Sequence, residues 1–217
     1  MSSPPEYTLS LVSSEDDFLA LATVKDSAFK SSAFAQLKLG PNTDLAGLAK
    51  YLLGSWKSDP EARFMKASLP SGQIIGFAKW NFFSTTDYHY PFPTEFLETG
   101  QPSLCKMFFD GLAKVMNEKM KGKKFIYMHF LAVDPKFQRM GIGKKLCDWG
   151  LKYADEKGLE AYIDASPEGK GLYEKCGWQV INTLDIDLSK WGGPKEISTS
   201  YNMWRPLGGV AENSEKV

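Results

Sequence analysis

The stretch that most constrains the fold is residues 125–143, where an apolar run, a turn and a glycine-rich segment follow one another directly. Residues 125–133 are almost all apolar, aromatic or β-branched, which predicts a strand buried on both faces. Pro135 has no N–H group and restricts Asp134, so the strand is expected to end there. Residues 138–143 read Gln-Arg-Met-Gly-Ile-Gly and begin a helical pattern that Gly158 is placed to end. We therefore expect a strand that leads through a glycine-rich turn straight into a helix.

Such a turn favours an anionic ligand. Backbone N–H groups at a helix N-terminus converge on one point, and the helix dipole adds partial positive charge there. The spacing is neither the G-x-G-x-x-G of dinucleotide-binding folds nor the Walker-loop pattern. Taken alone, Gln-x-x-Gly-x-Gly also fits an ordinary glycine-rich turn, so the ligand must be inferred from a second motif.

The second motif lies downstream, where residues 161–178 read as strand, helix and the start of another strand. Residues 172–178 are Leu-Tyr-Glu-Lys-Cys-Gly-Trp. Together with residues 138–143, they resemble the GNAT superfamily of acetyl-CoA-dependent N-acetyltransferases, whose members carry a Gln/Arg-x-x-Gly-x-Gly/Ala pyrophosphate loop and a later Leu-Tyr-x-x-x-Gly-Phe segment. Trp178 stands where that family usually has Phe. Motifs carry the resemblance from about residue 74 to 180, and the order of elements carries it before that.

The resemblance implies an α/β (α+β) fold, with a mixed, mostly antiparallel twisted sheet, a splayed central strand pair and flanking helices. It implies acetyl-CoA as co-substrate and no metal, with the pyrophosphate on the glycine-rich loop and the pantetheine arm along the strand before it. That strand is expected to splay from the one beginning near Ala161. The residues expected to bind the donor are Leu131, Ala132, Val133, Gln138, Arg139, Met140, Gly141, Ile142, Gly143, Lys144, Ser166 and Tyr173.

The resemblance also places the catalytic residues. Tyr173 is the expected general acid for the leaving thiolate, because a phenol with a pKa of about 10 is protonated at neutral pH. Packing beneath the cofactor is the alternative role for this side chain. Backbone N–H groups near Leu131 or Val133 are expected to stabilise the tetrahedral oxyanion. Cys176 precedes Gly177 and is expected to be buried, which argues against a covalent acyl-enzyme and favours direct transfer.

His129 is the expected general base, since its ordinary pKa lies near neutrality. It stands two residues before Leu131, so a regular strand would place both side chains on one face. The strand is similar to the histidine-containing strand of arylalkylamine N-acetyltransferases, although Tyr127 stands where those enzymes carry an earlier histidine. A water chain as the base, and a purely structural His129, remain open.

Length and charge fit a single enzyme domain. The 217 residues suffice for one core, and we expect residues 1–206 to form one N-acetyltransferase domain and 207–217 a flexible tail. Lysine plus arginine equals aspartate plus glutamate, at 26 each, so no nucleic-acid partner is expected.

The cysteine spacing and the lack of a long apolar segment bear on the cellular location of the protein. The three cysteines lack Cys-x-x-Cys spacing and read as reduced thiols rather than as a disulfide framework or zinc site. The first residues do not resemble a signal peptide, and no apolar run is long enough for a membrane span. We expect a cytoplasmic protein without a membrane partner.

The remaining elements follow from periodicity and turn residues. A first strand is expected at residues 7–12, then a helix to Phe29 that begins with a capping box of Ser13 or Ser14 with Asp16 or Asp17. Residues 31–34 are expected to lie in a loop. Further expectations are a helix at 44–55, a hairpin of 63–69 with 73–82, an irregular aromatic loop at 81–102, a helix at 103–120, and strands at 179–188 and 198–204.

The acceptor is less constrained than the donor. Phe29, Phe34 and the aromatic residues between Trp80 and Phe92 either line a pocket for an amine or pack in the core. We expect a small-molecule amine as the acceptor. A protein or peptide acetyltransferase and a non-catalytic CoA-binding module remain alternatives, and the sequence indicates no oligomeric state.

Overall fold

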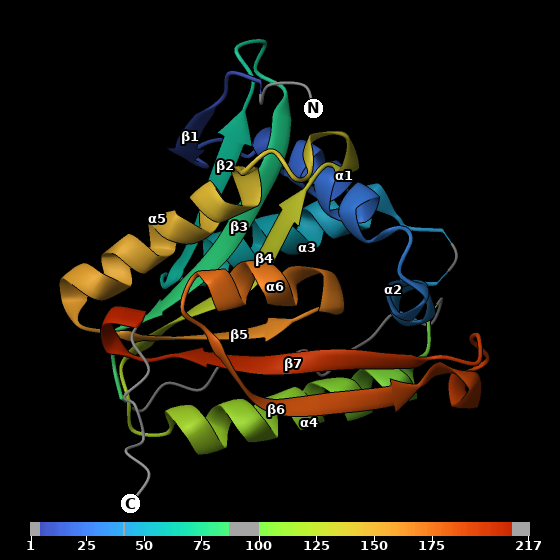
Figure 1. Ribbon diagram of the computed structural model, residues 1–217. Coiled ribbons are helices and arrows are strands. Elements are labelled where there is room, and N and C mark those ends of the chain that lie inside the picture. The colour runs from blue at the N-terminus through green and yellow to red at the C-terminus, as the bar shows by residue number, and fades with distance from the viewer. Residues whose placement is uncertain (1–4, 41, 87–99, 210–217) are drawn as a thin grey trace, which may run out of the picture.

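The computed structural model describes residues 5–40, 42–86 and 100–209 (Figure 1). These residues form one seven-stranded sheet in the order β1-β2-β3-β4-β5-β7-β6. The strands are β1 Thr8–Leu11, β2 Ala62–Ser68, β3 Ile74–Phe83, β4 Phe125–Val133, β5 Glu160–Ala165, β6 Gln179–Asp187 and β7 Ile197–Arg205. The α-helices are α1 Asp17–Phe29, α2 Ala33–Leu39, α3 Leu45–Ser58, α4 Pro102–Met120, α5 Ile142–Lys157 and α6 Pro167–Lys175. The mixed, mostly antiparallel sheet with flanking helices confirms the expected fold class.

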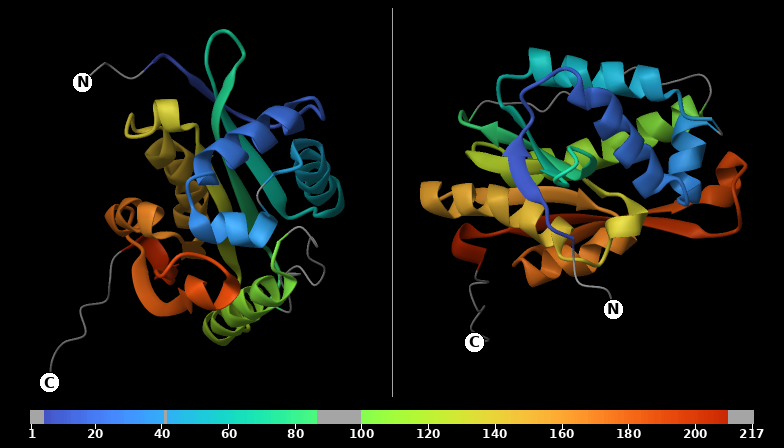
Figure 2. Two further views of the ribbon diagram at one scale, coloured as in Figure 1. Left: turned by 90° about the vertical axis from the view of Figure 1, so that its right-hand side faces the viewer. Right: turned by 90° about the horizontal axis from the view of Figure 1, so that it is seen from above.

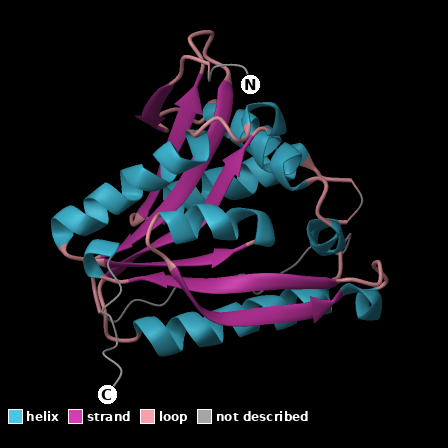
Figure 3. Cartoon of the chain, viewed as in Figure 1, coloured by secondary structure: helices cyan, strands magenta, loops and turns pink. Residues whose placement is uncertain are grey.

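The sheet has one parallel strand pair, β4 with β5, and every other neighbouring pair is antiparallel. A parallel pair requires a crossover connection, and α5 supplies it. β4 and β5 are in register only from Phe125 opposite Glu160 to Met128 opposite Ile163. Beyond Met128 the two strands diverge (Figure 3). The expected splay of the central strand pair is therefore present.

Helices cover both faces of the sheet (Figure 2). On one face, called the α1 face below, α1 and α3 pack on β2–β4 through Phe18, Leu52 and Phe77. On the opposite face, called the α5 face, α5 packs on β2–β5 through Leu146 and Ala154. The apolar residues of α5 recur at helical spacing, so one side of the helix faces the core and the other faces solvent.

Local signals explain the strand–turn–helix unit. β4 is buried over most of its length, as its composition predicts. Asp134 follows it and accepts a hydrogen bond from the N–H of Lys136 (2.9 Å), which tightens the turn. Gly158 ends α5 with a left-handed φ of 61°. Both limits of this unit agree with the sequence prediction.

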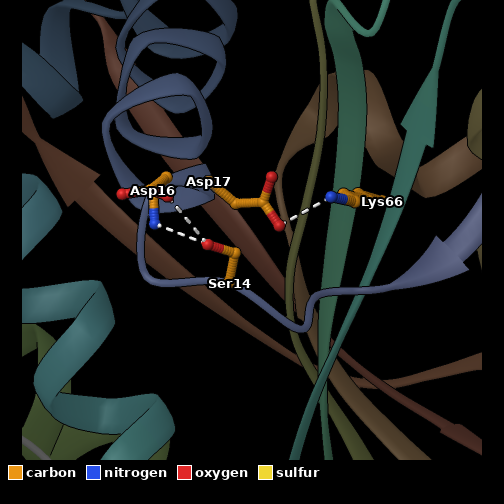
Figure 4. A network of polar contacts seen from close by, with 4 residues as sticks. All are labelled: Ser14, Asp16, Asp17 and Lys66. Atoms are coloured by element: carbon orange, nitrogen blue, oxygen red, sulfur yellow. Dashed lines mark hydrogen bonds and ion pairs between the residues drawn. The ribbon is translucent and has the colours of Figure 1, made fainter.

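The start of α1 differs from the expected capping box (Figure 4). Ser14 Oγ accepts from the N–H of Asp16 at 3.2 Å and donates to Asp16 Oδ2 at 3.1 Å, so it does not reach the first turn of the helix. Asp17 instead pairs with Lys66 of β2, with 2.6 Å between Nζ and Oδ2. The capping-box prediction is wrong because a tertiary ion pair takes one partner and a local Ser–Asp turn takes the other.

The segment expected to be a loop at residues 31–34 leads instead into α2. Ser32 caps this helix, and its Oγ accepts from the N–H of Ala35 at 3.2 Å. Phe34 packs edge-to-face against Phe108 of α4, with ring centroids 4.8 Å apart. A helix of this length has little stability alone, and packing against α4 supplies what the local sequence lacks.

Some expectations fall outside the described residues. Most of the expected aromatic loop lies in residues 87–99, and most of the expected tail in 210–217. Leu207–Gly209, which we assigned to the tail, form a 3₁₀ turn. Trp80 is fully buried on the α5 face, so of the two roles left open for it, lining an acceptor pocket or packing in the core, it has the second. Among the helices described, none combines the length and apolar character needed to cross a membrane.

Candidate active site

The splay leaves a polar strand edge within the sheet. The N–H of Asp134 donates to the carbonyl of Ile75, so Ala132 exchanges its backbone hydrogen bonds with Phe77 of β3. In an antiparallel ladder the alternate residues, Leu131 and Val133, then direct their N–H and C=O groups away from β3. On that side, the pairing of β4 with β5 has already ended. Leu131 and Val133 thus present backbone groups to the opening, whereas Ala132 does not.

His129 occupies a bulge in β4. The register passes from Lys79 opposite Phe130 to Trp80 opposite Met128, so His129 is the extra residue. The bulge shifts the side-chain alternation: Met128 and Leu131 both pack on the α5 face, and Phe130 packs on the α1 face. The prediction that His129 and Leu131 share a face is therefore wrong. Only the pairing with β3 reveals this shift.

The glycine-rich loop has the backbone geometry of an anion cradle. Arg139 has a left-handed φ of 63° and Gly141 one of 83°. Gly141 is the N-cap of α5, and no described side chain caps the helix. The N–H groups of the first turn are consequently available to a ligand. A Cβ built on Gly141 meets nothing within 4 Å, so the space beside the loop is open.

The loop side chains do not all face the cradle. Gln138 Nε2 donates to the carbonyl of Val133 at 3.0 Å, and Lys144 Nζ pairs with Asp148 at 2.7 Å. Ile142 is buried in the core, and Gly143 packs beside Leu131 and Leu172. Arg139 is exposed and Met140 is half-buried. The loop therefore offers an anion its backbone more than its side chains.

Tyr173 lies on the α5 face, in the same apolar cluster as Leu131. It is 6% exposed, and its ring packs edge-to-face on Trp178 with centroids 5.5 Å apart. Burial raises the pKa of Tyr173 well above its ordinary value, with smaller contributions from Cys147 and Cys176. The phenol is thus protonated throughout the physiological range. Ser166 is the N-cap residue of α6, the helix that carries Tyr173.

The two cysteines near Tyr173 are free thiols. Cys147 is fully buried, and Cys176 is partly exposed rather than buried as expected. A hydrogen bond between them raises the pKa of Cys147 and lowers the pKa of Cys176. No general base accompanies Cys176 among its described hydrogen-bond partners, and the geometry continues to favour direct transfer over an acyl-enzyme.

His129 lies among basic and aromatic groups. Its ring stacks on Phe130 with centroids 4.0 Å apart and on Tyr127 with centroids 5.6 Å apart. Its Nδ1 is 3.4 Å from Lys79 Nζ. Burial lowers the pKa of His129 well below its ordinary value, and the charges of Lys79, Lys25 and Lys38 lower it further. His129 is therefore neutral at physiological pH.

Asp164 is a polar residue of the site that sequence reasoning missed. It stands on β5, one residue past the last pair with β4. Tyr127 Oη donates to its Oδ2 at 3.0 Å, and Asn202 Nδ2 donates to its Oδ1 at 2.6 Å. Burial raises the pKa of Asp164 to about 6, while the hydrogen bonds oppose the shift. An acid alternating with apolar residues in a strand carried no motif that would have singled it out.

A cavity opens on the α1 face beside Lys79. It has a volume of about 550 Å³ and lies between α3 and β3. Its lining residues are Gly47, Lys50, Tyr51, Gly54, Ser55, Ser58, Asp59 and Lys79. Lys79 donates to Ser55 Oγ at 2.5 Å and also lies beside His129, so this side chain connects the cavity with the bulge. Within the described ranges, no three His, Cys, Asp or Glu side chains are grouped to hold a metal ion.

Comparisons with known proteins bear on the family and the fold. The model of the acetyltransferase (GNAT) family matches residues 46–178. A 71-residue segment is 35% identical to an uncharacterised N-acetyltransferase of Schizosaccharomyces pombe, and the match covers 31% of this chain and 30% of that protein.

Solved structures share the fold over nearly the whole chain. Arylalkylamine N-acetyltransferase 2 of Aedes aegypti superposes with a TM-score of 0.66 at 15% identity, and the superposition covers 94% of this chain and 100% of that one. Naa20 of Chaetomium thermophilum, solved with a bisubstrate analogue, gives a TM-score of 0.55 at 17% identity, covering 96% and 94%. At these identities the likeness concerns the fold alone.

Proposed function

Since the chain belongs to the acetyltransferase (GNAT) family, whose model matches more than half of it, we propose that it transfers the acetyl group of acetyl-CoA directly to the primary amine of a small molecule. The observation that carries the proposal is the opening between β4 and β5. It has a backbone anion cradle on the α5 face and a neutral His129 beside a cavity on the α1 face.

In this proposal the donor binds on the α5 face. The pyrophosphate accepts hydrogen bonds from the first-turn N–H groups of α5, and the pantetheine arm pairs with Leu131 and Val133 as an added strand would. Arg139, with its exposed side chain, is placed to add a cationic contact to the phosphates. The thioester then lies in the splay, where the N–H of Leu131 or Val133 stabilises the oxyanion.

Bond making and bond breaking follow from this placement. The neutral amine attacks the thioester carbonyl, so a C–N bond forms and the C–S bond of the tetrahedral intermediate breaks. The proton lost by the amine goes to His129 or to a water chain leading from it. The departing thiolate takes the phenolic proton of Tyr173, and the proton taken from the amine returns to the phenolate through water, which restores the enzyme. The products are the N-acetylated amine and CoA.

Deprotonation of the amine carries a substantial free-energy cost. An alkylamine with a pKa of about 10.4 is almost fully protonated at neutral pH, and its deprotonation costs about 4–5 kcal/mol. His129 is a weak base because of its buried, cationic surroundings, but it is already in the neutral form. We therefore assign it the role of accepting and passing on the proton, with water completing the path.

A thiol-release assay tests the proposal. The enzyme is incubated with acetyl-CoA and a panel of amines, amino acids, amino sugars, polyamines and peptides, and free CoA is measured. We expect turnover with a small amine, and Tyr173→Phe should lower kcat by about 100-fold, in the range typical of a lost general acid. Tyr153→Phe on the exposed side of α5 is the matched control and should leave kcat unchanged.

The same assay separates the alternatives. Turnover with peptides and with none of the small molecules would replace the small-molecule proposal with a protein acetyltransferase. Tight CoA binding without thiol release from any member of the panel would indicate a binding module. Unchanged kcat in both Tyr173→Phe and His129→Ala would remove these two side chains from the mechanism.

A further inference from the structure

Basic side chains from four separate elements gather on the α1 face of the opening. They are Lys25 of α1, Lys38 of α2, Lys79 of β3 and His129 of β4, and we call them the basic cluster. Lys79 Nζ lies 3.4 Å from His129 Nδ1. The charges of all three lysines act on the His129 ring. The cluster therefore surrounds the proposed base, on the side opposite the anion cradle of α5.

Lys25 and Lys38 contact aromatic rings. Lys25 Nζ is 4.8 Å from the ring centroid of Phe130, next to His129 in sequence. Lys38 Nζ is 4.5 Å from the ring centroid of Phe34 and 4.7 Å from that of Phe108. Within the part of the chain that the structure describes, neither ammonium group forms an ion pair. Aromatic faces satisfy these charges only in part, because a cation–π contact contributes less than a desolvated carboxylate partner.

The pKa values of Lys25 and Lys38 are lowered, as expected for ammonium groups that contact aromatic rings and no described carboxylate. Burial lowers the pKa of Lys25 to about 8, and the charge of Lys38 adds to the effect while Asp26 opposes it. Burial likewise lowers the pKa of Lys38 to about 8, with Cys105 opposing. Both are still mainly protonated at pH 7. The fold thus maintains two incompletely compensated positive charges beside the opening.

These charges constrain the acceptor. A simple cationic amine entering the opening is repelled by them, whereas a molecule with an anionic group gains a charge-assisted contact. We propose that the acceptor is a primary amine that also carries a carboxylate or phosphate-type group, and that Lys25 and Lys38 bind this group. The inference rests on the proposed function and names the substrate class of the same site.

The arrangement also assists the chemistry. The anionic group holds the molecule at Lys25 and Lys38, so that its amine reaches toward His129. Nearby positive charge lowers the pKa of a bound ammonium group, which reduces the free energy needed to deprotonate it. One cluster therefore both selects an anionic acceptor and favours the reactive form of its amine.

Matched acceptors test the inference. The kcat/KM of phenethylamine is compared with that of phenylalanine, and that of ethylamine with those of β-alanine and 2-aminoethylphosphonate. We expect the wild-type enzyme to favour the anionic member of at least one set by tenfold or more. Lys25→Met and Lys38→Met should each reduce that preference about tenfold. If the wild-type enzyme favours the amine without the anionic group in every set, or if the variants lower kcat/KM equally for both members of a set, the inference is wrong.

A lysine in a similar setting provides the control. Lys119 lies in the last turn of α4 and is not part of the basic cluster, and its Nζ is 3.6 Å from the ring centroid of Trp204. Lys119→Met removes a cation over an aromatic ring and should leave the preference unchanged. Lys25→Gln and Lys38→Gln replace the methionine variants if those do not fold, with the same expectation.

Calorimetry distinguishes failure of the inference from failure of the proposed function. CoA-saturated enzyme is titrated with N-acetylphenylalanine and with N-acetylphenethylamine. Tighter binding of the carboxylate, lost in Lys25→Met and Lys38→Met, supports the anionic site even if no acceptor turns over. Equal binding overturns it, whatever the thiol-release assay shows. The affinity for CoA itself should be unchanged in both variants, and its loss would assign the lysines to the donor instead.

Discussion

At the scale of single residues, Asp164 has a carboxyl group whose burial opposes its charged form. Its carboxyl group accepts hydrogen bonds from Tyr127 and Asn202. Burial nonetheless raises its pKa to about 6. The folded state therefore retains a proton that the unfolded chain releases near pH 4. The protonated carboxyl group contributes stability at low pH, and that contribution is lost as the pH rises through about 6.

Asp164→Asn tests this loss of stability at higher pH. The amide does not titrate, so the stability of the variant relative to wild type should increase between pH 4 and pH 8, by on the order of 2–3 kcal/mol. Urea unfolding at a series of pH values measures the difference. Asp110→Asn, on the exposed side of α4, controls for loss of a surface charge. A difference that is flat with pH, or that falls, would contradict the buried-charge account.

The residues of the site show how far the sequence leads. Tyr173 and the glycine-rich loop are recognisable because their spacing along the chain is itself the signal. The bulge at His129 is not, because it depends on which residue of β3 stands opposite. The proximity of Lys25 and Lys38 could likewise not be predicted, since α1 and α2 bring them together only in three dimensions.

At the scale of elements, α5 depends on a close approach to the sheet. A Cβ added to Gly150 would lie 2.3 Å from Trp80 Cε2, so the glycine makes room for the indole. Trp80 in turn stacks on Trp178, with ring centroids 6.4 Å apart. This contact fixes the helix, and hence the cradle at its N-terminus, relative to β3 and β4.

Gly150→Ala should therefore destabilise the protein. Alanine favours a helix by about 1 kcal/mol over glycine, but the clash with a fully buried ring outweighs that gain, and we expect a net loss of about 1–3 kcal/mol. Gly54→Ala in α3 is the matched control, because a Cβ there meets nothing within 4 Å and stability should rise slightly. Thermal unfolding of both variants measures the contrast. Equal effects would mean that Trp80 does not set the position of α5.

Elements with strong local signals were predictable and those stabilised by distant contacts were not. β4, α5 and the hairpin of β2 with β3 follow from apolar patterns, turn residues and the terminal Gly158. α2 escaped prediction because seven residues make a marginal helix until α4 packs against it. The expected cap of α1 failed for the same reason, since Lys66 belongs to another element.

At the scale of the whole molecule, the sheet consists of two parts that meet at β4 and β5. Only four register pairs join these strands, from Phe125 to Met128. A donor bound in the splay would contact both parts and add to that limited contact. Binding to the folded state alone raises its stability by about 2.7 kcal/mol at a ligand concentration of 100 times Kd.

CoA should accordingly raise the Tm by about 5–10 °C at such a concentration. Gly141→Glu places a negative side chain in the cradle and should abolish the rise. Gly141→Ala shares the strain of a positive φ without the charge, and should keep most of it. Thermal unfolding with and without CoA compares the three proteins. A full shift in Gly141→Glu would locate the phosphates elsewhere.

The distribution of the site along the chain has an evolutionary consequence. Every position assigned to the donor, from Leu131 to Tyr173, lies inside the segment that the family model matches, residues 46–178. Lys25 and Lys38 precede that segment. On the two proposals above, the choice of amine could therefore change in evolution through substitutions in α1 and α2, while the acetyl-CoA site in the matched segment stays the same.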